Sequence, residues 1–257
     1  MTVYAEFPNK TGEVLQLSPG EIHFLWWFIQ GSIMNPSTRT RLRRAWGLCQ
    51  RHAWGWMVVE AAFRNAYMHG PAVLYEDLMT TAAPLFVLHG PGQLFRLARR
   101  LKGKSPCLMC EEGYDASSTG FVKPHIVQQG RDVTQFKRLA GKTAAFWSRG
   151  VCGRCANTDS PLRCRIHLME DISTGHAKHI ELHRDAFANI VERLRRYARS
   201  FQFEFQGTRT NEDEAALIEA VGWCSGWETF LVLLRSSDGA GNVGQDTTKT
   251  LYMRKAQ

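Results

Sequence analysis

Residues 46–68 read WGLCQRHAWGWMVVEAAFRNAYM, and this stretch indicates the fold class. From His52 to Met68 the apolar residues recur at spacings of three and four, at Trp56, Val59, Ala62, Phe63 and Ala66. This period places them on one face of a helix. Cys49 and His52, which two residues separate, precede this face. The stretch therefore predicts a helix next to a pair of side chains that bind metals well.

Similar helical patterns cover most of the chain. Ser18-Pro19-Gly20-Glu21 is a helix start, with Ser18 as N-cap and Glu21 at the third helical position. It predicts a helix over 21–34. The other helices that we predict span 38–46, 52–68, 72–88 with an interruption at Pro84, 93–101, 132–147, 171–205 with a break near Gly175, and 212–234.

Two segments between these helices, 103–130 and 149–161, contain turn-forming residues and cysteines and are expected to be loops. The only clear alternation of apolar and polar residues, at 201–205, ends a helical pattern, so its structure stays open. The sequence therefore predicts a mainly α fold, with one or more helical domains and metal-binding Cys/His loops.

The motifs suggest a division of the chain into four parts. These are an irregular lead-in (1–19), a first helical half with a CxxH motif (20–102), a second half with two CxxC motifs and a CxxH motif (103–234), and a mobile tail (235–257). The tail is expected to be mobile because it is poor in apolar residues and opens with Gly and Asp turn signals.

The bulk composition favours a folded intracellular protein. Of 257 residues, 44% are hydrophobic and 11% aromatic, which suffices for a core without disulfide staples. No apolar leader precedes Leu15, and the apolar run 24–29 is too short to cross a bilayer. We therefore expect a cytoplasmic protein with no membrane association, whose seven cysteines stay reduced and serve metal or redox chemistry.

Six of the seven cysteines occur in four pairs of potential ligands, each with a gap of two residues. These pairs are Cys49/His52, Cys107/Cys110, Cys152/Cys155 and Cys164/His167. The gap allows a tight turn to place both side chains on one tetrahedral ion. Eight ligands suffice for two closed sites, and thiolates favour zinc, so we expect two zinc ions. The seventh cysteine, Cys224, is expected to be a buried free thiol.

The sequence leaves open which pairs share an ion. Cys152/Cys155 and Cys164/His167 are near neighbours and resemble a compact Cys₃His knuckle, which would leave Cys49/His52 to join Cys107/Cys110. This arrangement is favoured because closing a short loop costs less entropy. The alternative joins Cys107/Cys110 to Cys164/His167, and Cys152/Cys155 to Cys49/His52.

A resemblance extends over roughly residues 20–226. The stretch 46–54 with 73–78, and the downstream PCLMC (106–110) and CRIHL (164–168), resemble an uncharacterised bacterial family of helical Cys/His proteins. That family has two tandem halves, each with a CxxC and then a GxCxxH motif. This chain departs from the pattern: no CxxC precedes Cys49, Cys152/Cys155 is additional, and Leu162 replaces a glycine. These departures favour the alternative pairing, and the resemblance implies no activity.

Other polar residues have simpler interpretations. His176, His179 and His183 share one helical face and could bind a third metal ion, although a solvated face is the commoner arrangement. Glu60, Glu76 and Asp77 lie among apolar residues. They could be acid–base groups, but surface carboxylates or acceptors for a ligating histidine are more common there. No catalytic residue is assigned.

The net charge of +8 favours acidic partners. Basic residues cluster at 39–44, 96–104 and 193–199, and three such clusters could form one surface that binds phosphates. The candidate nucleic-acid contacts are Arg41, Arg43, Arg44, Arg96, Arg99, Arg100, Arg195 and Arg196.

Together these patterns predict a zinc-stabilised binding or adaptor protein whose partner is a nucleic acid or another protein. The alternative is a thiol-redox or metal-handling protein that uses its CxxC pairs. Redox CxxC motifs usually belong to a thioredoxin-like α/β pattern, which this sequence lacks. An enzyme is therefore the less favoured interpretation.

Overall fold

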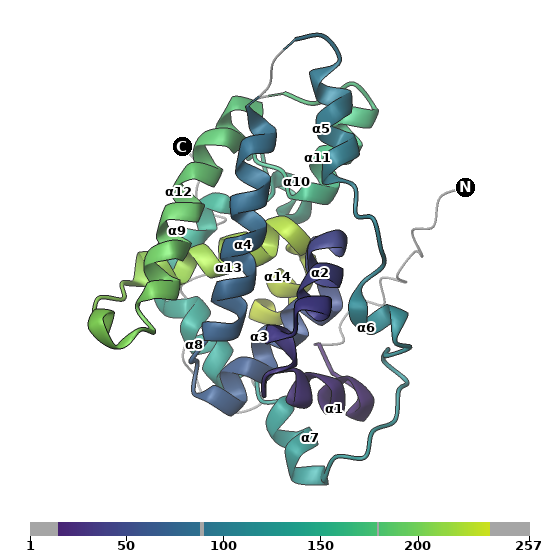
Figure 1. Cartoon of the computed structure of the whole chain (residues 1–257), viewed down its shortest axis with the longest axis vertical. Helices are drawn as coiled ribbons and strands as arrows, with labels where there is room; N and C mark the ends of the chain where they lie inside the picture. The colour runs from purple at the N-terminus through teal and green to yellow at the C-terminus, as the bar shows by residue number, and fades with distance from the viewer. Residues whose placement is uncertain (1–14, 88–89, 179, 237–257) are drawn as a thin grey trace.

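The computed structural model describes residues 15–87, 90–178 and 180–236, which form a helical assembly (Figure 1). No β-strand occurs in these ranges, so the predicted mainly α class is confirmed. The α-helices are α1 (Pro19–Phe28), α2 (Pro36–Ala45), α3 (Gln50–Arg64), α4 (His69–Ala82), α5 (Gln93–Leu101), α6 (Leu108–Glu111), α7 (Pro124–Gly130), α8 (Thr134–Lys142), α9 (Ala144–Trp147), α10 (Gly153–Ala156), α11 (Arg165–Ser173), α12 (Ile180–Arg199), α13 (Asn211–Ser225) and α14 (Glu228–Arg235). Short 3₁₀ helices are η1 (Ser32–Met34), η2 (Ala83–Phe86), η3 (Ser148–Gly150) and η4 (Phe203–Phe205).

The first helix begins as its capping sequence predicts. The backbone N–H of Ser18 donates to the Glu21 carboxylate at 2.6 Å, and the Ser18 hydroxyl accepts from the Glu21 N–H at 3.2 Å. The helix ends at Phe28, earlier than the predicted Met34. Gly31, with φ of 136°, turns the chain into η1, and this backbone conformation cannot continue an α-helix.

Helices α3 and α13 are the two most deeply buried helices described. Every residue from His52 to Ala61 is buried, so α3 is enclosed on all sides over this stretch, which the one-sided apolar face did not predict. Trp54 stacks on Phe230 of α14 with 4.5 Å between ring centroids. Helices α1, α7, α8 and α14 pack around α3, and only its first two and last three residues reach solvent.

The two predicted halves share one hydrophobic core. The long helix α12 lies along α4 and also packs against α13 (Figure 1). Buried side chains such as Leu78 of the first half and Leu194 of the second belong to the same cluster. The break predicted near Gly175 lies between α11 and α12, and Pro84 lies in η2, which interrupts the predicted helix 72–88.

The expected loops need correction, because 103–130 contains α6 and α7 and 149–161 contains α10. The predicted last helix is divided at Gly226, whose φ of 102° ends α13. The alternating segment 201–205, whose structure the sequence left open, includes the 3₁₀ helix η4. The mobile tail lies almost wholly outside the described residues, as does most of the lead-in. None of the helices described is both long and apolar enough to cross a bilayer.

Gly222 on α13 offers a test of the packing around α14. A Cβ atom there would lie 2.2 Å from the buried indole of Trp227, whereas a Cβ at exposed Gly141 on α8 would meet no atom within 4 Å. We expect Gly222→Ala to destabilise the fold by about 1–3 kcal/mol through overpacking. The matched control, Gly141→Ala, should stabilise it by about 0.5–1 kcal/mol because alanine favours the helix. Thermal melts followed by circular dichroism measure both, and equal melting temperatures would contradict the described packing.

Candidate metal centres

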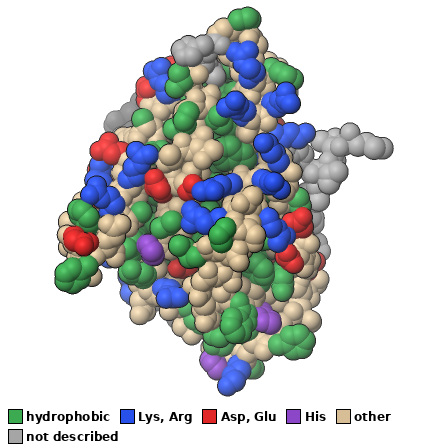
Figure 2. Space-filling model, viewed as in Figure 1, with side chains coloured by type: hydrophobic (Ala, Val, Ile, Leu, Met, Phe, Trp, Pro, Cys, Tyr) green, Lys and Arg blue, Asp and Glu red, His purple; other side chains and the backbone are tan. Residues whose placement is uncertain are grey.

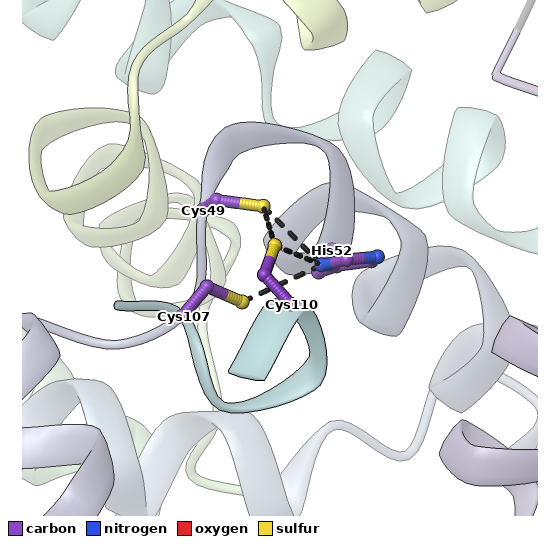
Figure 3. A group of neighbouring side chains, drawn as sticks. All are labelled: Cys49, His52, Cys107 and Cys110. Atoms are coloured by element: carbon purple, nitrogen blue, oxygen red, sulfur yellow. Dashed lines mark hydrogen bonds between the residues drawn. The ribbon is translucent and has the colours of Figure 1, made fainter. Parts of the chain in front are cut away.

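The eight predicted ligands form two clusters, each with three cysteines and one histidine. The first cluster contains Cys49, His52, Cys107 and Cys110 (Figure 3), and the second contains Cys152, Cys155, Cys164 and His167. Within each cluster the potential ligand atoms all lie within 4.8 Å of one another. This is the arrangement that loop closure favours, and the alternative pairing is not observed. No third group of this kind occurs in the part of the chain that the structure describes.

The distances in the first cluster match a tetrahedral site. The Nδ1 atom of His52 lies 3.3 Å from the Sγ of Cys49 and 3.4 Å from those of Cys107 and Cys110. The Sγ atoms of Cys49 and Cys110 are 3.8 Å apart. Bond lengths of about 2.3 Å to sulfur and about 2.0 Å to nitrogen in a tetrahedron imply edges of about 3.5–3.8 Å. The cluster therefore has the size of a four-coordinate metal site.

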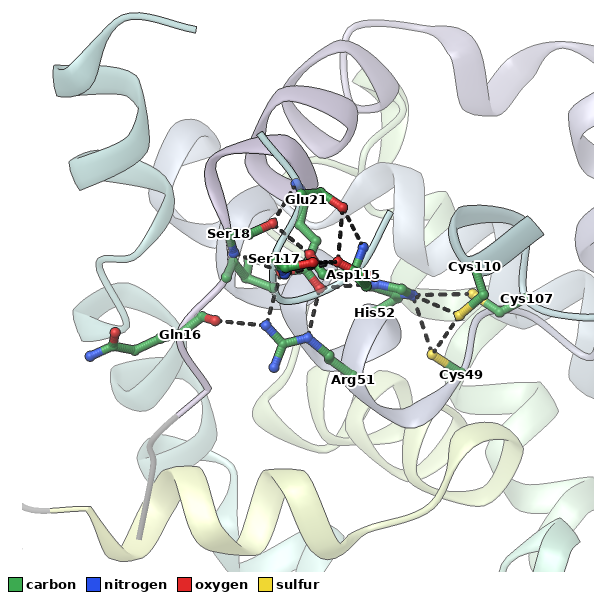
Figure 4. Close-up of polar contacts among 12 residues, drawn as sticks. Gln16, Ser18, Glu21, Cys49, Arg51, His52, Cys107, Cys110, Asp115 and Ser117 are labelled. Atoms are coloured by element: carbon green, nitrogen blue, oxygen red, sulfur yellow. Dashed lines mark hydrogen bonds and ion pairs between the residues drawn. The ribbon is translucent and has the colours of Figure 1, made fainter. Parts of the chain in front are cut away.

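The other ring nitrogen of His52 is held by a buried carboxylate (Figure 4). Its Nε2 atom lies 3.0 Å from Oε1 of Glu21, which is fully buried. Arg51 donates to both oxygens of Glu21, at 2.6 and 2.9 Å. Although burial opposes ionisation, the hydrogen bonds from His52 and Arg51 lower the pKa of Glu21 to about 2. An ionised Glu21 favours the His52 tautomer with the proton on Nε2, which leaves the Nδ1 lone pair free for a metal ion.

The thiols and the imidazole of the first cluster shift one another's pKa. Contact with Cys107 raises the pKa of the Cys49 thiol, whereas hydrogen bonds from Cys110 and Cys49 lower the pKa of Cys107. Hydrogen bonds from the adjacent thiols stabilise one thiolate, and the charge of that thiolate then opposes ionisation of a second thiol. Burial opposes protonation of His52, but contacts with Cys107, Cys110 and Glu21 raise its pKa to about 11. A divalent cation would allow all three thiols to ionise and leave the imidazole neutral.

The second cluster repeats this geometry. The Nδ1 atom of His167 lies 3.3 Å from the Sγ atoms of Cys152 and Cys155 and 3.4 Å from that of Cys164. The Sγ atoms of Cys155 and Cys164 are again 3.8 Å apart. Contacts with Cys152 and Cys155 raise the pKa of His167 to about 10. This cluster has the same capacity for a metal ion as the first.

Both clusters are built from the same local structures. Cys49 and Cys164 are the N-caps of α3 and α11, and each accepts a backbone hydrogen bond of 2.8 Å from the residue four positions later. Cys107 and Cys152 are likewise the N-caps of the short helices α6 and α10. The first turn of a helix brings the residue three positions after the N-cap back to the same side. The two-residue gap in all four pairs follows from this geometry.

Different charged residues surround the second cluster. Asp171 on α11 accepts hydrogen bonds from Arg154 at 2.8 Å and from Arg163 at 2.7 Å, which ties the CxxC and CxxH segments together. Gly153 lies so close to the chain that a Cβ would approach the Ser160 carbonyl oxygen to 2.2 Å. The glycine in this CxxC motif therefore permits the tight return of the loop to the cluster.

The remaining candidates do not join either cluster. His183 is buried against Phe86 and Phe187, and burial together with the charge of Arg163 lowers its pKa to about 4. His176 lines a pocket on the surface, and His179 lies outside the described residues.

The predicted carboxylates also lie elsewhere. Glu60 accepts a hydrogen bond from Trp56, Glu76 pairs with Arg195, and Asp77 pairs with Arg43. The acceptor for the His52 ring is Glu21, which sequence reasoning identified only as a helix cap. Nothing in the spacing of the chain indicates that role, since Glu21 precedes His52 by 31 positions.

Of the eight candidate nucleic-acid contacts, five line one surface groove. Arg43, Arg44, Arg96, Arg99 and Arg100 lie along it, together with Lys102 and Lys104. Arg41 instead pairs with Glu111 and Glu112. Residues of the third basic cluster do not line the groove. Arg195 pairs with Glu76, and Arg196 pairs with Asp213 and Glu192.

No protein-family profile matches this sequence, and the searches of curated proteins and of solved structures produced no significant match.

The two clusters predict the metal content of the protein. We expect two metal ions per chain, one in each cluster. Cys107→Ser and Cys152→Ser should each lower the content to one ion, because three remaining ligands hold a structural ion weakly. Cys224→Ala, which removes the one cysteine outside the clusters, should retain two ions. Elemental analysis of protein prepared under reducing conditions measures this, and a metal-free wild-type protein would rule out both centres.

Glu21 provides a second test that is specific to the first cluster. Glu21→Gln keeps the size of the side chain but removes the charge that orients His52. Loss of such a partner typically costs about 10–100-fold in metal affinity. We therefore expect a chelator titration to show one ion released at a correspondingly lower chelator concentration. The ion in the second cluster is the internal control, and a variant that releases both ions as wild type does would contradict the role of Glu21.

Proposed function

We propose that this protein is a zinc-stabilised intracellular binding protein that contacts nucleic acid through a basic groove. Three thiolates and one imidazole are a ligand set that suits zinc better than magnesium or calcium. The seven cysteines are all free thiols, which suits a reducing compartment such as the cytoplasm.

The closed ligand sets favour a structural role for the metal over catalysis. A catalytic zinc site usually has three protein ligands and an open position for water. Here each cluster offers four ligands, of which two in each cluster are buried and only Cys110 is exposed. The thiol-redox alternative loses support for the same reason, because all six paired cysteines lie within ligand distance of a histidine nitrogen and would be occupied by metal.

The observation that carries the proposed partner is the basic groove. Lys and Arg side chains gather on the right of the face in Figure 2, over α5 and α2, whereas basic and acidic side chains alternate over α12. In the groove Arg44, Arg99, Arg100, Lys102 and Lys104 are exposed and make no side-chain ion pair among the described residues. Basic side chains without acidic neighbours are available to bind phosphates.

Residues near the two clusters make hydrogen bonds that hold the segments of the groove in place. Arg165, which follows Cys164 directly, donates to the carbonyl of Leu101 at the end of α5 at 3.0 Å. The N–H of Lys104, three positions before Cys107, donates to the carbonyl of Arg44 at 2.7 Å. A metal ion in each cluster would therefore hold one side of the groove in place. The proposed role of the two zinc ions is to stabilise the nucleic-acid-binding groove.

The proposal predicts binding that depends steeply on salt. A fluorescently labelled oligonucleotide should bind at low salt, and binding should weaken as salt rises because counterions are released. Arg99→Glu with Arg100→Glu should weaken binding and make the log–log salt slope shallower by about 0.7 for each phosphate of a single strand that the variant no longer neutralises. We choose these two because Arg96 also donates to the Pro91 carbonyl and supports the turn before α5.

The control is a double reversal with the same change in charge at exposed sites that do not line the groove, Lys123→Glu with Arg138→Glu. This variant should retain most of the affinity. Equal losses in the two variants would indicate a response to net charge alone, and no binding of any nucleic acid at low salt would refute the proposed partner.

A further inference from the structure

The floor of the basic groove is apolar. The groove has a volume of about 760 Å³, and besides its seven basic residues it is lined by Trp46, Leu85, Thr40 and Thr81. Trp46 lies largely below the surface at 6% exposure, and Leu85 of η2 is half-buried. Cations at the rim and an aromatic and aliphatic floor are separate features. Contacts with phosphate explain the first but not the second.

The backbone of Trp46 holds its ring in this position. Trp46 ends α2 in the left-handed conformation, with φ of 60° and ψ of 42°, which is uncommon for a bulky side chain and costs about 1–2 kcal/mol. Glycine or asparagine usually occupies such a helix end. The indole packs edge-to-face against Trp223, with 6.0 Å between ring centroids. The strained turn and the buried partner together fix the ring in the lining of the groove.

The form of nucleic acid that suits such a groove is a single strand. In a duplex the base faces are stacked inside, and the phosphates lie on the outside of a wide cylinder, so an apolar floor remains without a partner. A single strand can place its phosphates on the rim and turn its unstacked bases toward the floor. Aromatic and apolar surfaces of this kind bind bases with little sequence preference.

We propose that the groove binds single-stranded nucleic acid, with phosphates on the arginines and lysines of the rim and at least one base against Trp46 and Leu85. This inference rests on the proposed function and specifies the ligand of the same groove. The base contributes to affinity here in addition to the charge of the backbone.

Three labelled oligonucleotides test the proposal with the full-length, zinc-loaded protein at low salt. They are a 12-nucleotide single strand, a duplex of the same sequence, and an abasic single strand with the same number of phosphates. Each base contact is worth about 1–3 kcal/mol, which corresponds to about 5–150-fold in affinity. We expect the single strand to bind at least about fivefold more tightly than either of the others.

Each outcome of this comparison has one meaning. If the duplex or the abasic strand binds as tightly as the single strand, the inference is wrong while the proposed function stands. If none of the three binds, the proposed function fails and the inference fails with it. A single strand that binds more tightly than both supports the inference.

A pair of variants assigns the base contact to the floor. Leu85→Ala removes a lining side chain, and Val87→Ala, two residues further on, removes an exposed side chain that does not line the groove. Leu85→Ala should weaken binding of the single strand and leave the abasic strand unchanged, whereas Val87→Ala should change neither. A similar loss for both strands would overturn the role of the floor. Circular dichroism melts establish that both variants fold, and the comparison of oligonucleotides with the wild-type protein stands if one does not.

Discussion

The structure depends on the convergence of residues 49–52 with residues 107–110 on one point. Between these two segments the chain forms α3, α4 and α5 and then returns to the start of α3. A metal ion bound by both segments would close this long loop and remove much of the entropy of the unfolded chain, as a disulfide does. The histidine in this cluster lies in the first turn of α3, a helix in which every residue from His52 to Ala61 is buried. The position of the ligand and the packing of the core therefore constrain each other.

The corner between α13 and α14 links the two clusters. Near the first cluster, the Ser225 hydroxyl donates to the Leu48 carbonyl at 2.9 Å, and the Trp54 indole donates to the Gly226 carbonyl at 2.9 Å. On the other side, Arg165 beside the second cluster donates to the Cys224 carbonyl at 3.0 Å. The hydrogen bonds from Trp54 and Arg165 satisfy carbonyl groups that would otherwise be unpaired at the C-terminus of α13. Loss of metal from either cluster would therefore disturb the same contacts at the junction of α13 and α14.

The candidate metal ligands and the proposed nucleic-acid groove occupy different parts of the same segments. The ligands lie at helix N-termini and all but Cys110 are buried or half-buried, whereas the basic residues of the groove lie on exposed positions of α2, α5 and the segment after α5. Exposed charges contribute little to stability, so they are free to serve recognition. The buried clusters supply the rigidity that a groove needs to hold its cations at fixed spacing.

Local patterns in the sequence account for the helical class, the capping box at Ser18, the break near Gly175 and the four ligand pairs. Each depends on residues within a few positions of one another, where spacing and helix geometry leave few alternatives. The pattern at 52–68 did not indicate that α3 is enclosed on all sides, because one-dimensional periodicity does not count how many neighbours surround a helix. The pattern at 212–234 likewise did not distinguish one helix from two across Gly226, because a glycine permits either continuation or a break.

The sequence by itself determined which residues can bind metal and where charge accumulates. Only the tertiary structure decided that Cys49 and His52 meet Cys107 and Cys110, and that Glu21 orients His52. It also decided that residues of two basic clusters form one groove, while Arg193, Arg195 and Arg196 of the third pair with acidic neighbours. The reason is physical: ligand geometry within one turn is set by local backbone angles, whereas distances between separate helices are set by the packing of side chains from the whole core.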